Sequence, residues 1–132
     1  MTVQRRIDLT HSTDAPAQAR RIVAAFLAEV ERVHGHPSSA TTVDAVLLVA
    51  SELVTNAVRH TPGPCTLSLT LQDQGVLVEV SDTSPALPRP RLPDITGACG
   101  GWGWPMIDRL ADEVRVTRGP GGGKTVRTRL SW

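Results

Sequence analysis

The sequence predicts an α+β two-layer sandwich, in which helices cover one face of a mixed, largely antiparallel sheet. Two amphipathic helical segments follow one another, two alternating segments then read as a hairpin, and a long unpatterned segment interrupts the second half. The chain has 132 residues, of which 40% are apolar and 20% are charged. These values are typical of a globular protein, and we expect residues 1–132 to form one domain.

The composition argues against several functional classes. A net charge of +1 and only three Trp and one Phe offer little for nucleic-acid binding. The uninterrupted apolar runs are shorter than the ~20 residues of a membrane span, and the N-terminal residues do not read as a secretory signal. Cys65 and Cys99 have no CxxC spacing, which predicts two free thiols. We therefore expect a cytoplasmic protein that binds neither nucleic acid nor membrane.

The first part of the chain predicts a strand and a helix. A loose alternation over residues 2–9 is typical of a strand. Thr13 or Asp14 can cap the helix that follows, because Pro16 then lies in the first turn, where a missing N–H costs nothing. Apolar residues recur at spacings of three and four from residue 19 to residue 30, which predicts one apolar face.

A second helix is predicted to end at about His60. The candidates for its N-cap are Ser38, Ser39 and Thr41. Glu52, Asn56 and His60 are spaced four apart, so they form one polar row beside the apolar face. Such a row is usually a solvated helix edge. A carboxylate can act as a base, however, and an amide oxygen can bind Mg²⁺, and phosphoryl transfer needs both functions close together.

The middle of the chain predicts an antiparallel hairpin and then a long loop. Residues 65–72 alternate strictly, Asp73-Gln74-Gly75 form a turn, and the alternation resumes over residues 76–80. Residues 83–103 have no period and are rich in Gly and Pro. A loop of about twenty residues inside a compact domain is often a functional lid.

The last part of the chain predicts a helix and two strands. Helical spacing returns at Met106, Ile107, Leu110, Ala111 and Val114. Residues 113–117 and 124–131 then alternate like strands. The glycine-rich turn before Lys124-Thr125 superficially resembles a P-loop. Arg118 stands where that motif needs its first Gly, and a strand follows where it needs a helix, so we reject the P-loop.

Four segments, taken in order, resemble the motifs of the GHKL ATPases, the superfamily of gyrase and the histidine kinases. They are Glu52–His60, similar to the N box; Val78–Pro85, similar to the G1 box; Gly100–Ile107, similar to the G2 box; and Gly121–Val126, similar to the last Gly-rich turn. The branch that the chain resembles most is that of the small bacterial anti-sigma factor serine kinases. The resemblance implies the Bergerat fold, with residues 83–103 as an ATP lid.

The resemblance also implies roles for individual residues toward ATP and Mg²⁺. Asp82 is expected to accept a hydrogen bond from the adenine amino group, with a water shared with Thr125. Asn56 is expected to coordinate Mg²⁺, and Glu52 to polarise the attacking hydroxyl. The backbone N–H groups expected to cradle the phosphates belong to Gly100, Gly101, Trp102 and Gly103.

The function that the resemblance implies is that of a serine/threonine protein kinase of the anti-sigma type. Such a protein binds a sigma factor and phosphorylates an anti-anti-sigma (STAS-type) protein, and a homodimer is compatible with it. The first alternative is a regulator that binds ATP and a partner without transferring phosphate. The presence of Glu52 favours catalysis, whereas Ser84 and Ala86, where G1 boxes usually have Gly, favour binding alone. The second alternative is a detached catalytic domain of a histidine kinase.

Overall fold

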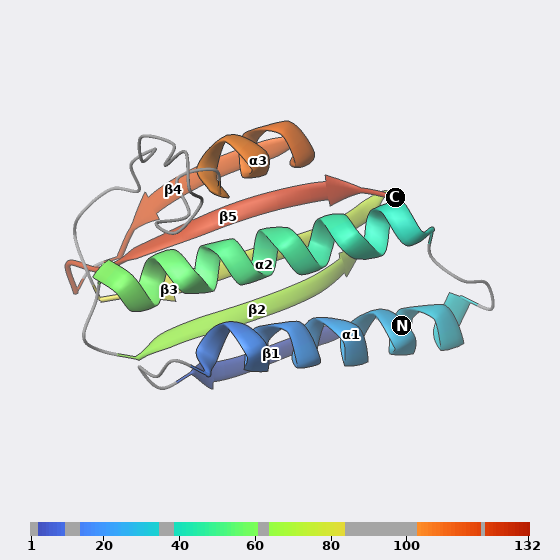
Figure 1. Ribbon diagram of the computed structural model, residues 1–132, viewed down its shortest axis with the longest axis horizontal. Helices are drawn as coiled ribbons and strands as arrows, with labels where there is room; N and C mark the ends of the chain where they lie inside the picture. The colour runs from blue at the N-terminus through green and yellow to red at the C-terminus, as the bar shows by residue number, and fades with distance from the viewer. Residues whose placement is uncertain (1–2, 10–13, 35–38, 61–63, 84–102, 120) are drawn as a thin grey trace, which may run out of the picture.

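The computed structural model describes residues 3–9, 14–34, 39–60, 64–83, 103–119 and 121–132 (Figure 1). Three helices and five strands are found in this part of the chain. In chain order they are β1 (Gln4–Leu9), α1 (Ala15–His34), α2 (Ala40–His60), β2 (Cys65–Gln72), β3 (Gly75–Asp82), α3 (Gly103–Leu110), β4 (Glu113–Arg118) and β5 (Lys124–Ser131).

The five strands form one sheet in the order β1-β2-β3-β5-β4, and each described pairing is antiparallel. The sequence predicted a mixed, largely antiparallel sheet, and the described strands make it antiparallel throughout. The reason lies in the connections. Two helices separate β1 from β2, so the chain returns to the end where β1 finished and β2 runs back along it. A single helix separates β3 from β4, which makes these two strands parallel, but β5 lies between them.

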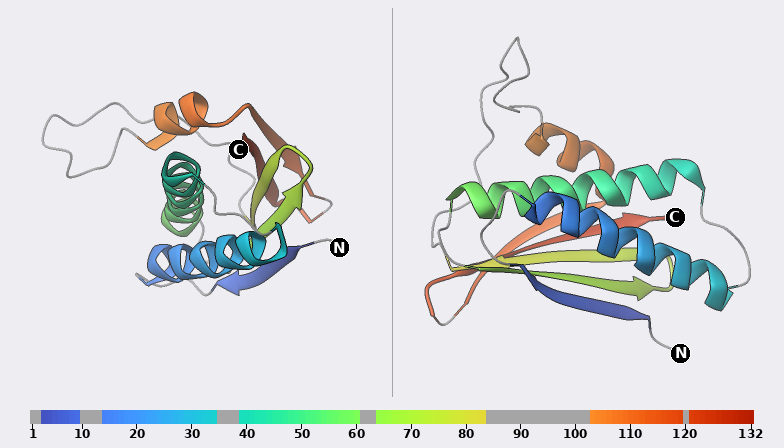
Figure 2. Two further views of the ribbon diagram at one scale, coloured as in Figure 1. Left: turned by 90° about the vertical axis from the view of Figure 1, so that its right-hand side faces the viewer. Right: turned by 60° about the horizontal axis from the view of Figure 1, so that its bottom comes forward.

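The three helices cover one face of the sheet, as predicted for a two-layer α+β fold (Figure 2). The core lies between the layers, where strand residues of one parity meet the apolar faces of α1 and α2. Its largest fully buried side chains include Phe26 of α1, Val49 and Val54 of α2, and Leu67 and Leu69 of β2. The β5 pattern alternates strictly between buried and less buried residues, as expected when only one sheet face is covered.

Two of the predicted N-cap candidates cap the long helices. The carbonyl of Asp14 accepts the N–H of Gln18 at 2.9 Å, which makes Asp14 the residue before the first turn of α1. Ser39 accepts the N–H of Thr42 on its hydroxyl at 3.1 Å and starts α2. A side-chain cap such as that of Ser39 is worth about 1 kcal/mol. Both helices begin beside residues that the sequence offered as caps.

The central helix α2 is apolar enough to raise a second interpretation. By length and composition alone, Ala40–Arg59 could cross a membrane. In the structure, however, the apolar side of α2 packs into the core, where Val46, Ala50 and Leu53 are almost completely buried. The core helix of a globular fold has the same composition, so its place in the fold accounts for it.

The third helix is shorter than the predicted apolar spacing. α3 ends at Leu110, which is 37% exposed, and Val114 belongs to β4. Ile107 is the α3 side chain that reaches the core, with 1% exposure. The helical period therefore stops where the chain must turn to enter β4.

Candidate functional site

The candidate site lies at one end of the sheet, where β3 ends and β5 begins. Figures 1 and 2 show the C-terminal end of α2 over this same end, with the β4–β5 turn beside it. The strand register aligns a row of residues across the sheet: Leu9 pairs with Cys65, and Asp82 pairs with Lys124. Cys65 stands opposite Asp82, because the next residue along β2, Thr66, pairs with Ser81.

Asp82 and Lys124 form a buried ion pair in this row. Lys124 Nζ donates to both carboxylate oxygens of Asp82, at 3.0 Å to Oδ1 and 2.9 Å to Oδ2. The two side chains are only 6% and 3% exposed, for Lys124 and Asp82 respectively. Buried charges are tolerated when they are paired and hydrogen-bonded in this way. The strand β5, the last in the chain, thus places a lysine next to the carboxylate expected to bind adenine.

Sequence reasoning assigned no role to Lys124, although a signal for it was present. Along β5, Val126, Thr128 and Leu130 are buried, and Lys124 shares their parity. A lysine with the same parity as core residues points to the face of the sheet that the helices cover, and it needs an anionic partner there. The rejection of the P-loop is confirmed, because Lys124 begins a strand rather than a helix.

Thr125 lines the same hollow as Asp82, but its hydroxyl has a different hydrogen-bond partner. Its hydroxyl lies 2.7 Å from that of Ser81, its partner in the register of β3 and β5. Consecutive residues of a strand point to opposite faces of the sheet. Thr125 and Ser81 therefore lie on one face, and Asp82 and Lys124 lie on the other. The water expected between Asp82 and Thr125 stays a prediction.

The β4–β5 turn closes over the end of β3 and needs glycine at two positions. Gly122 has a φ of 86°, a conformation that glycine adopts without strain. A Cβ on Gly123 would lie 2.2 Å from the carbonyl oxygen of Asp82, so only glycine permits this approach. A shallow hollow of about 270 Å³ opens here, lined by Ser81, Asp82, Thr83, Gly119, Gly121, Gly123, Lys124 and Thr125.

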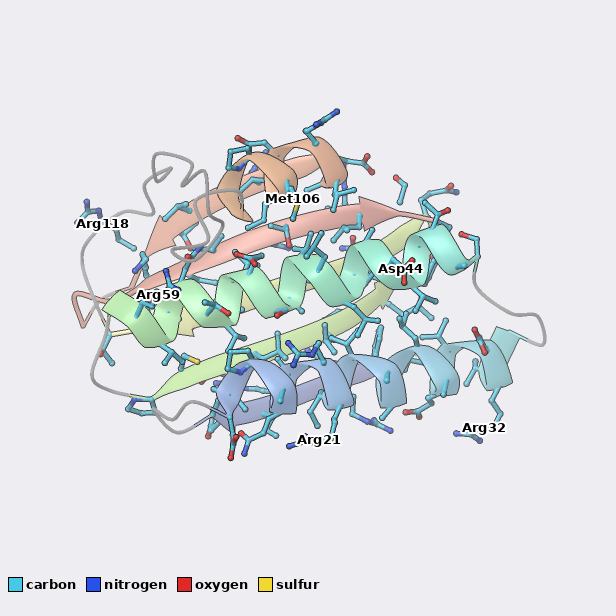
Figure 3. The ribbon with its side chains drawn as sticks, in the orientation of Figure 1. Arg21, Arg32, Asp44, Arg59, Met106 and Arg118 are labelled. Atoms are coloured by element: carbon cyan, nitrogen blue, oxygen red, sulfur yellow. The ribbon has the colours of Figure 1, made fainter. Side chains whose placement is uncertain are left out.

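Glu52 and Asn56 lie one helical turn apart on α2, in the half of the helix that covers this end of the sheet. Both side chains are half-buried rather than fully solvated. Burial raises the pKa of Glu52 above its ordinary value, while the positive charge of Arg59 acts in the opposite direction. Figure 3 shows Arg59 at the C-terminal end of α2. A carboxyl with a raised pKa is a better proton acceptor once ionised, which suits a general base.

Cys65 lies in the same row across the sheet as Asp82, and the charge of Asp82 affects its thiol. Burial raises the pKa of its thiol, and the negative charge of Asp82 raises that pKa further. Cys65 is free and only 3% exposed. It therefore packs as a small apolar side chain beside the ion pair and is not an activated nucleophile.

The remaining predicted residues border the lid. Gly100, Gly101 and Trp102, like most of the expected lid, lie outside the described residues, as does Cys99. Gly103 begins α3, so the expected phosphate-binding segment leads directly into a helix N-terminus. The phosphate-binding role of this segment stays a prediction.

The residues present fit a nucleotide and a magnesium ion by their chemistry. Asp82 offers a buried carboxylate beside a turn whose glycines leave room on one side of the strand end. Asn56 and Glu52 offer an amide oxygen and a carboxylate, and oxygen ligands of these kinds are the ones that Mg²⁺ prefers. The polar residues of α2 and the ends of β3 and β5 gather at one end of the fold.

A helix-covered antiparallel sheet that carries a polar site of this kind at one end is the architecture of a nucleotide-binding ATPase domain. Residues 12–130 match the histidine kinase-like ATPase domain, and the chain belongs to this family. The GHKL resemblance drawn from the four motifs is thereby confirmed. Membership in a family of ATPase domains identifies ATP as the nucleotide that the chain binds.

Two similar proteins support the same placement. The chain is 30% identical over 133 residues to the anti-sigma F factor of Pasteuria penetrans, a match that covers 91% of this chain and 85% of that protein. It is also similar in structure to the RsbU and RsbW domains of a Mycobacterium tuberculosis protein, with a TM-score of 0.70 and 22% identity. That match covers 97% of this chain and 31% of the longer one, and it supports the fold.

Proposed function

We propose that the chain is an anti-sigma-type regulator and an ATP-dependent serine/threonine protein kinase that phosphorylates an anti-anti-sigma protein. The observation that carries the proposal is the half-buried Glu52, with its raised pKa, one helical turn from Asn56 in an ATPase domain. The similarity to an anti-sigma F factor supports the regulatory class. The proposed partners are a sigma factor and a STAS-type anti-anti-sigma protein, and the proposed location is the cytoplasm.

The reaction would transfer the γ-phosphoryl group of ATP to a hydroxyl of the partner protein. Asp82 would hold the adenine and Asn56 would bind Mg²⁺, which neutralises charge on the phosphates. Glu52 would accept the proton of the attacking Ser or Thr hydroxyl as its oxygen bonds to phosphorus and the bond to the β-phosphate oxygen breaks. ADP leaves, and Glu52 returns its proton to solvent. Gly103 and the residues before it would donate N–H groups to the phosphates.

The experiment follows labelled phosphate from ATP to a STAS-type anti-anti-sigma protein of the same organism. Glu52→Gln should lower the transfer rate by roughly 10²- to 10⁴-fold, the usual contribution of a general base, and should leave ATP binding intact. Asp44→Asn is the matched control, because Asp44 is an exposed carboxylate two turns away towards the other end of the same helix (Figure 3). Transfer that survives Glu52→Gln would remove Glu52 from the reaction.

Asn56 is tested separately, through binding. Asn56→Ala removes the proposed metal ligand, so Mg²⁺-dependent ATP affinity should fall while metal-free affinity changes little. If Asn56→Ala weakens binding but the wild-type chain transfers no phosphate to its partner, the chain is a binding-only regulator. If neither substitution has an effect, the polar row of α2 is a solvated helix edge.

A further inference from the structure

The face of the sheet that the described helices do not cover, called the open face below, carries a cluster of arginines. Figure 2 shows the three helices together on the opposite face. Because side chains alternate along a strand, the odd-numbered residues of β4 and β5 lie on the open face. A hollow of about 190 Å³ opens there, and it is lined by Gln72, Leu77, Glu113, Arg115, Arg127 and Arg129.

This hollow is short of negative charge. Three guanidinium groups and one carboxylate line it, which leaves a local charge of +2. The carboxylate of Glu113 contacts both Arg115 and Arg129. Arg127 has no side-chain ion pair or hydrogen bond among the described residues, although Glu79 is its neighbour in the register of β3 and β5. The hollow therefore has room for one more anionic group beside Arg127.

Two of the arginines stand directly opposite each other. Arg115 of β4 is the register partner of Arg127 of β5, and like charges in opposed positions destabilise a sheet. The side chain of Arg115 is 72% exposed and Arg127 is exposed too, so water weakens the repulsion. An anion seated between the two guanidinium groups would replace this repulsion by two attractions. The charges of the sheet thus favour an anionic ligand at this place.

The floor of the hollow is apolar. Leu77 is the only apolar side chain that the described strands place on the open face, and it is 7% exposed although no described helix covers it. Its register partners are Thr70 and Arg129, and the methylene groups of an arginine can cover apolar surface. An apolar group can therefore rest on this floor while a carboxylate beside it reaches the arginines.

We propose that the hollow docks an acidic segment of a partner protein, in which an apolar side chain stands next to Asp or Glu. Charge complementarity favours this partner over a second copy, because symmetrical packing around the hollow would bring the arginines against their own copies. The volume is below the roughly 300–1,000 Å³ of sites for drug-sized ligands, so side chains of a larger molecule fit better than a nucleotide. The inference does not depend on the proposed kinase function.

The first test titrates ¹⁵N-labelled protein with the probe peptide Glu-Asp-Leu-Glu-Asp, blocked at both ends, and follows the backbone amide signals by NMR. The signals of Leu77, Arg127 and Arg129 should shift, while those of Asp82 and Gly123 should stay in place. The uncharged peptide Gln-Asn-Leu-Gln-Asn should cause no shift, and Glu-Asp-Ser-Glu-Asp should bind more weakly because it has no apolar side chain. No shifts with the probe peptide, or equal shifts with the uncharged one, would overturn the inference.

The second test separates the hollow from the overall charge. Arg127→Glu should weaken binding of the probe peptide roughly 5- to 30-fold, because an attraction between exposed charges becomes a repulsion. Arg6→Glu is the matched control with the same change in net charge. Arg6 is an exposed cation of the open face, but two strands separate β1 from β5, which places it about 14 Å from Arg127 and beyond the Debye length. Equal losses in the two variants would overturn the inference.

The remaining outcomes identify other occupants. If inorganic phosphate shifts the same signals as strongly as the peptide does, the hollow is a site for small anions. If sedimentation shows a wild-type dimer that Arg127→Glu dissociates, the open face belongs to a second copy. Either result overturns the docking of an acidic segment. ATP binding should be unchanged in Arg127→Glu, and the wild-type titrations decide the question even if the variant does not fold.

Discussion

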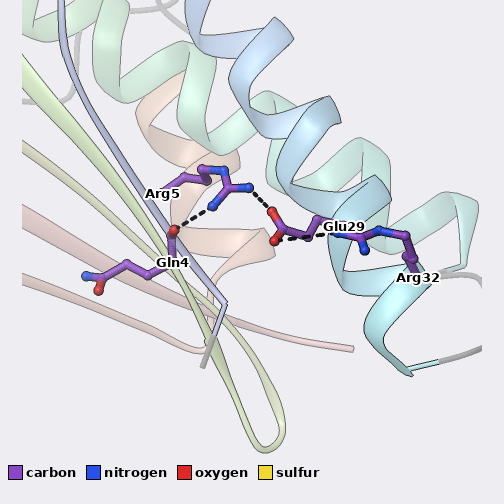
Figure 4. A network of polar contacts seen from close by, with 4 residues as sticks. All are labelled: Gln4, Arg5, Glu29 and Arg32. Carbon is purple, nitrogen blue, oxygen red and sulfur yellow. Dashed lines mark hydrogen bonds and ion pairs between the residues drawn. The ribbon is translucent and has the colours of Figure 1, made fainter. Parts of the chain in front are cut away.

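Two ion-pair regions of this molecule join a cationic side chain to a carboxylate in opposite surroundings. At one edge of the sheet, Arg5 of β1 and Arg32 of α1 both contact the carboxylate of Glu29 (Figure 4). Their side chains are 49% and 76% exposed, and that of Glu29 is 21% exposed. At the site, Lys124 and Asp82 are almost completely buried. Comparing the two regions separates the stabilisation that comes from charge attraction from the free energy that it costs to remove the charges from water.

At the sheet edge, water screens the charges, and the pairs join α1 to β1 without a large desolvation cost. Exposed pairs of this kind typically contribute 0.2–1 kcal/mol. At the site, both charges have been removed from water, and their attraction mainly compensates for that removal. Burial therefore makes the site pair sensitive to the loss of either partner.

The largest expected effect on stability is that of breaking the buried pair. Lys124→Met leaves the Asp82 carboxylate buried without its cation and should lower the free energy of unfolding by about 3–5 kcal/mol. Urea unfolding at neutral pH measures this loss. Arg118→Met removes the neighbouring exposed cation and should change the stability by no more than ~0.5 kcal/mol. Equal effects of the two substitutions would contradict the distinction between buried and exposed cations.

The next largest effect is expected when both buried charges, Lys124 and Asp82, are removed together. In the double variant Lys124→Met, Asp82→Leu no unpaired charge remains, so stability should recover much of the loss. The coupling between the two substitutions should reach about 1–3 kcal/mol, the range seen for residues in contact. ATP binding should still be lost, because the carboxylate proposed to bind adenine is gone. Additive losses in stability would show that the two side chains do not act as a pair.

These residues also show how far sequence reasoning reaches. The caps at Asp14 and Ser39 and the two long helices depend on local signals, and they were predicted. A largely antiparallel sheet was predicted as well, but the position of β5 between β3 and β4 was not, because no local pattern encodes which strands become neighbours. The position of Asp82 at a strand end was visible in the G1 motif, but its partner is 42 residues away.

The burial of Lys124 shows why the site was only partly predictable. The motif drew attention to Thr125, whereas the alternation of β5 decides which side chains face the core. Lys124 has the same parity as Val126 and Leu130 and is buried with them. Its partner Asp82 lies on another strand, so the ion pair depends on the pairing of β3 with β5, which no local pattern encodes.

A smaller effect is expected from the exposed network. Glu29→Gln should lower the free energy of unfolding by about 0.2–1 kcal/mol in dilute buffer, because it removes the carboxylate shared by Arg5 and Arg32. In 1 M salt, where the Debye length is ~3 Å, the difference should nearly vanish. The loss caused by Lys124→Met should persist in 1 M salt, because ions do not reach the buried pair. A salt-independent effect of Glu29→Gln would place that carboxylate in the buried class.

The smallest effect concerns Glu52, which lies between the two regions in burial. Because burial raises its pKa above about 4.5, the folded chain holds this proton more tightly than the unfolded chain does. The stability contributed by protonated Glu52 is therefore present at acidic pH and is lost as the pH rises through the raised pKa. Glu52→Gln removes this loss, so the variant should match wild type below pH ~4 and exceed it at pH 7. The gain should be within about 0.5 kcal/mol.

Urea unfolding of both proteins between pH 4 and 7 measures the difference, and charges common to both cancel in it. Arg59→Gln should widen the gap, because the charge that lowers the pKa of Glu52 is then absent. A wild-type chain that gains stability relative to Glu52→Gln as the pH rises would mean that the carboxylate is stabilised by the fold. Glu52 would then behave as a partner in an ion pair, like Glu29, and would be poorly suited to accept a proton.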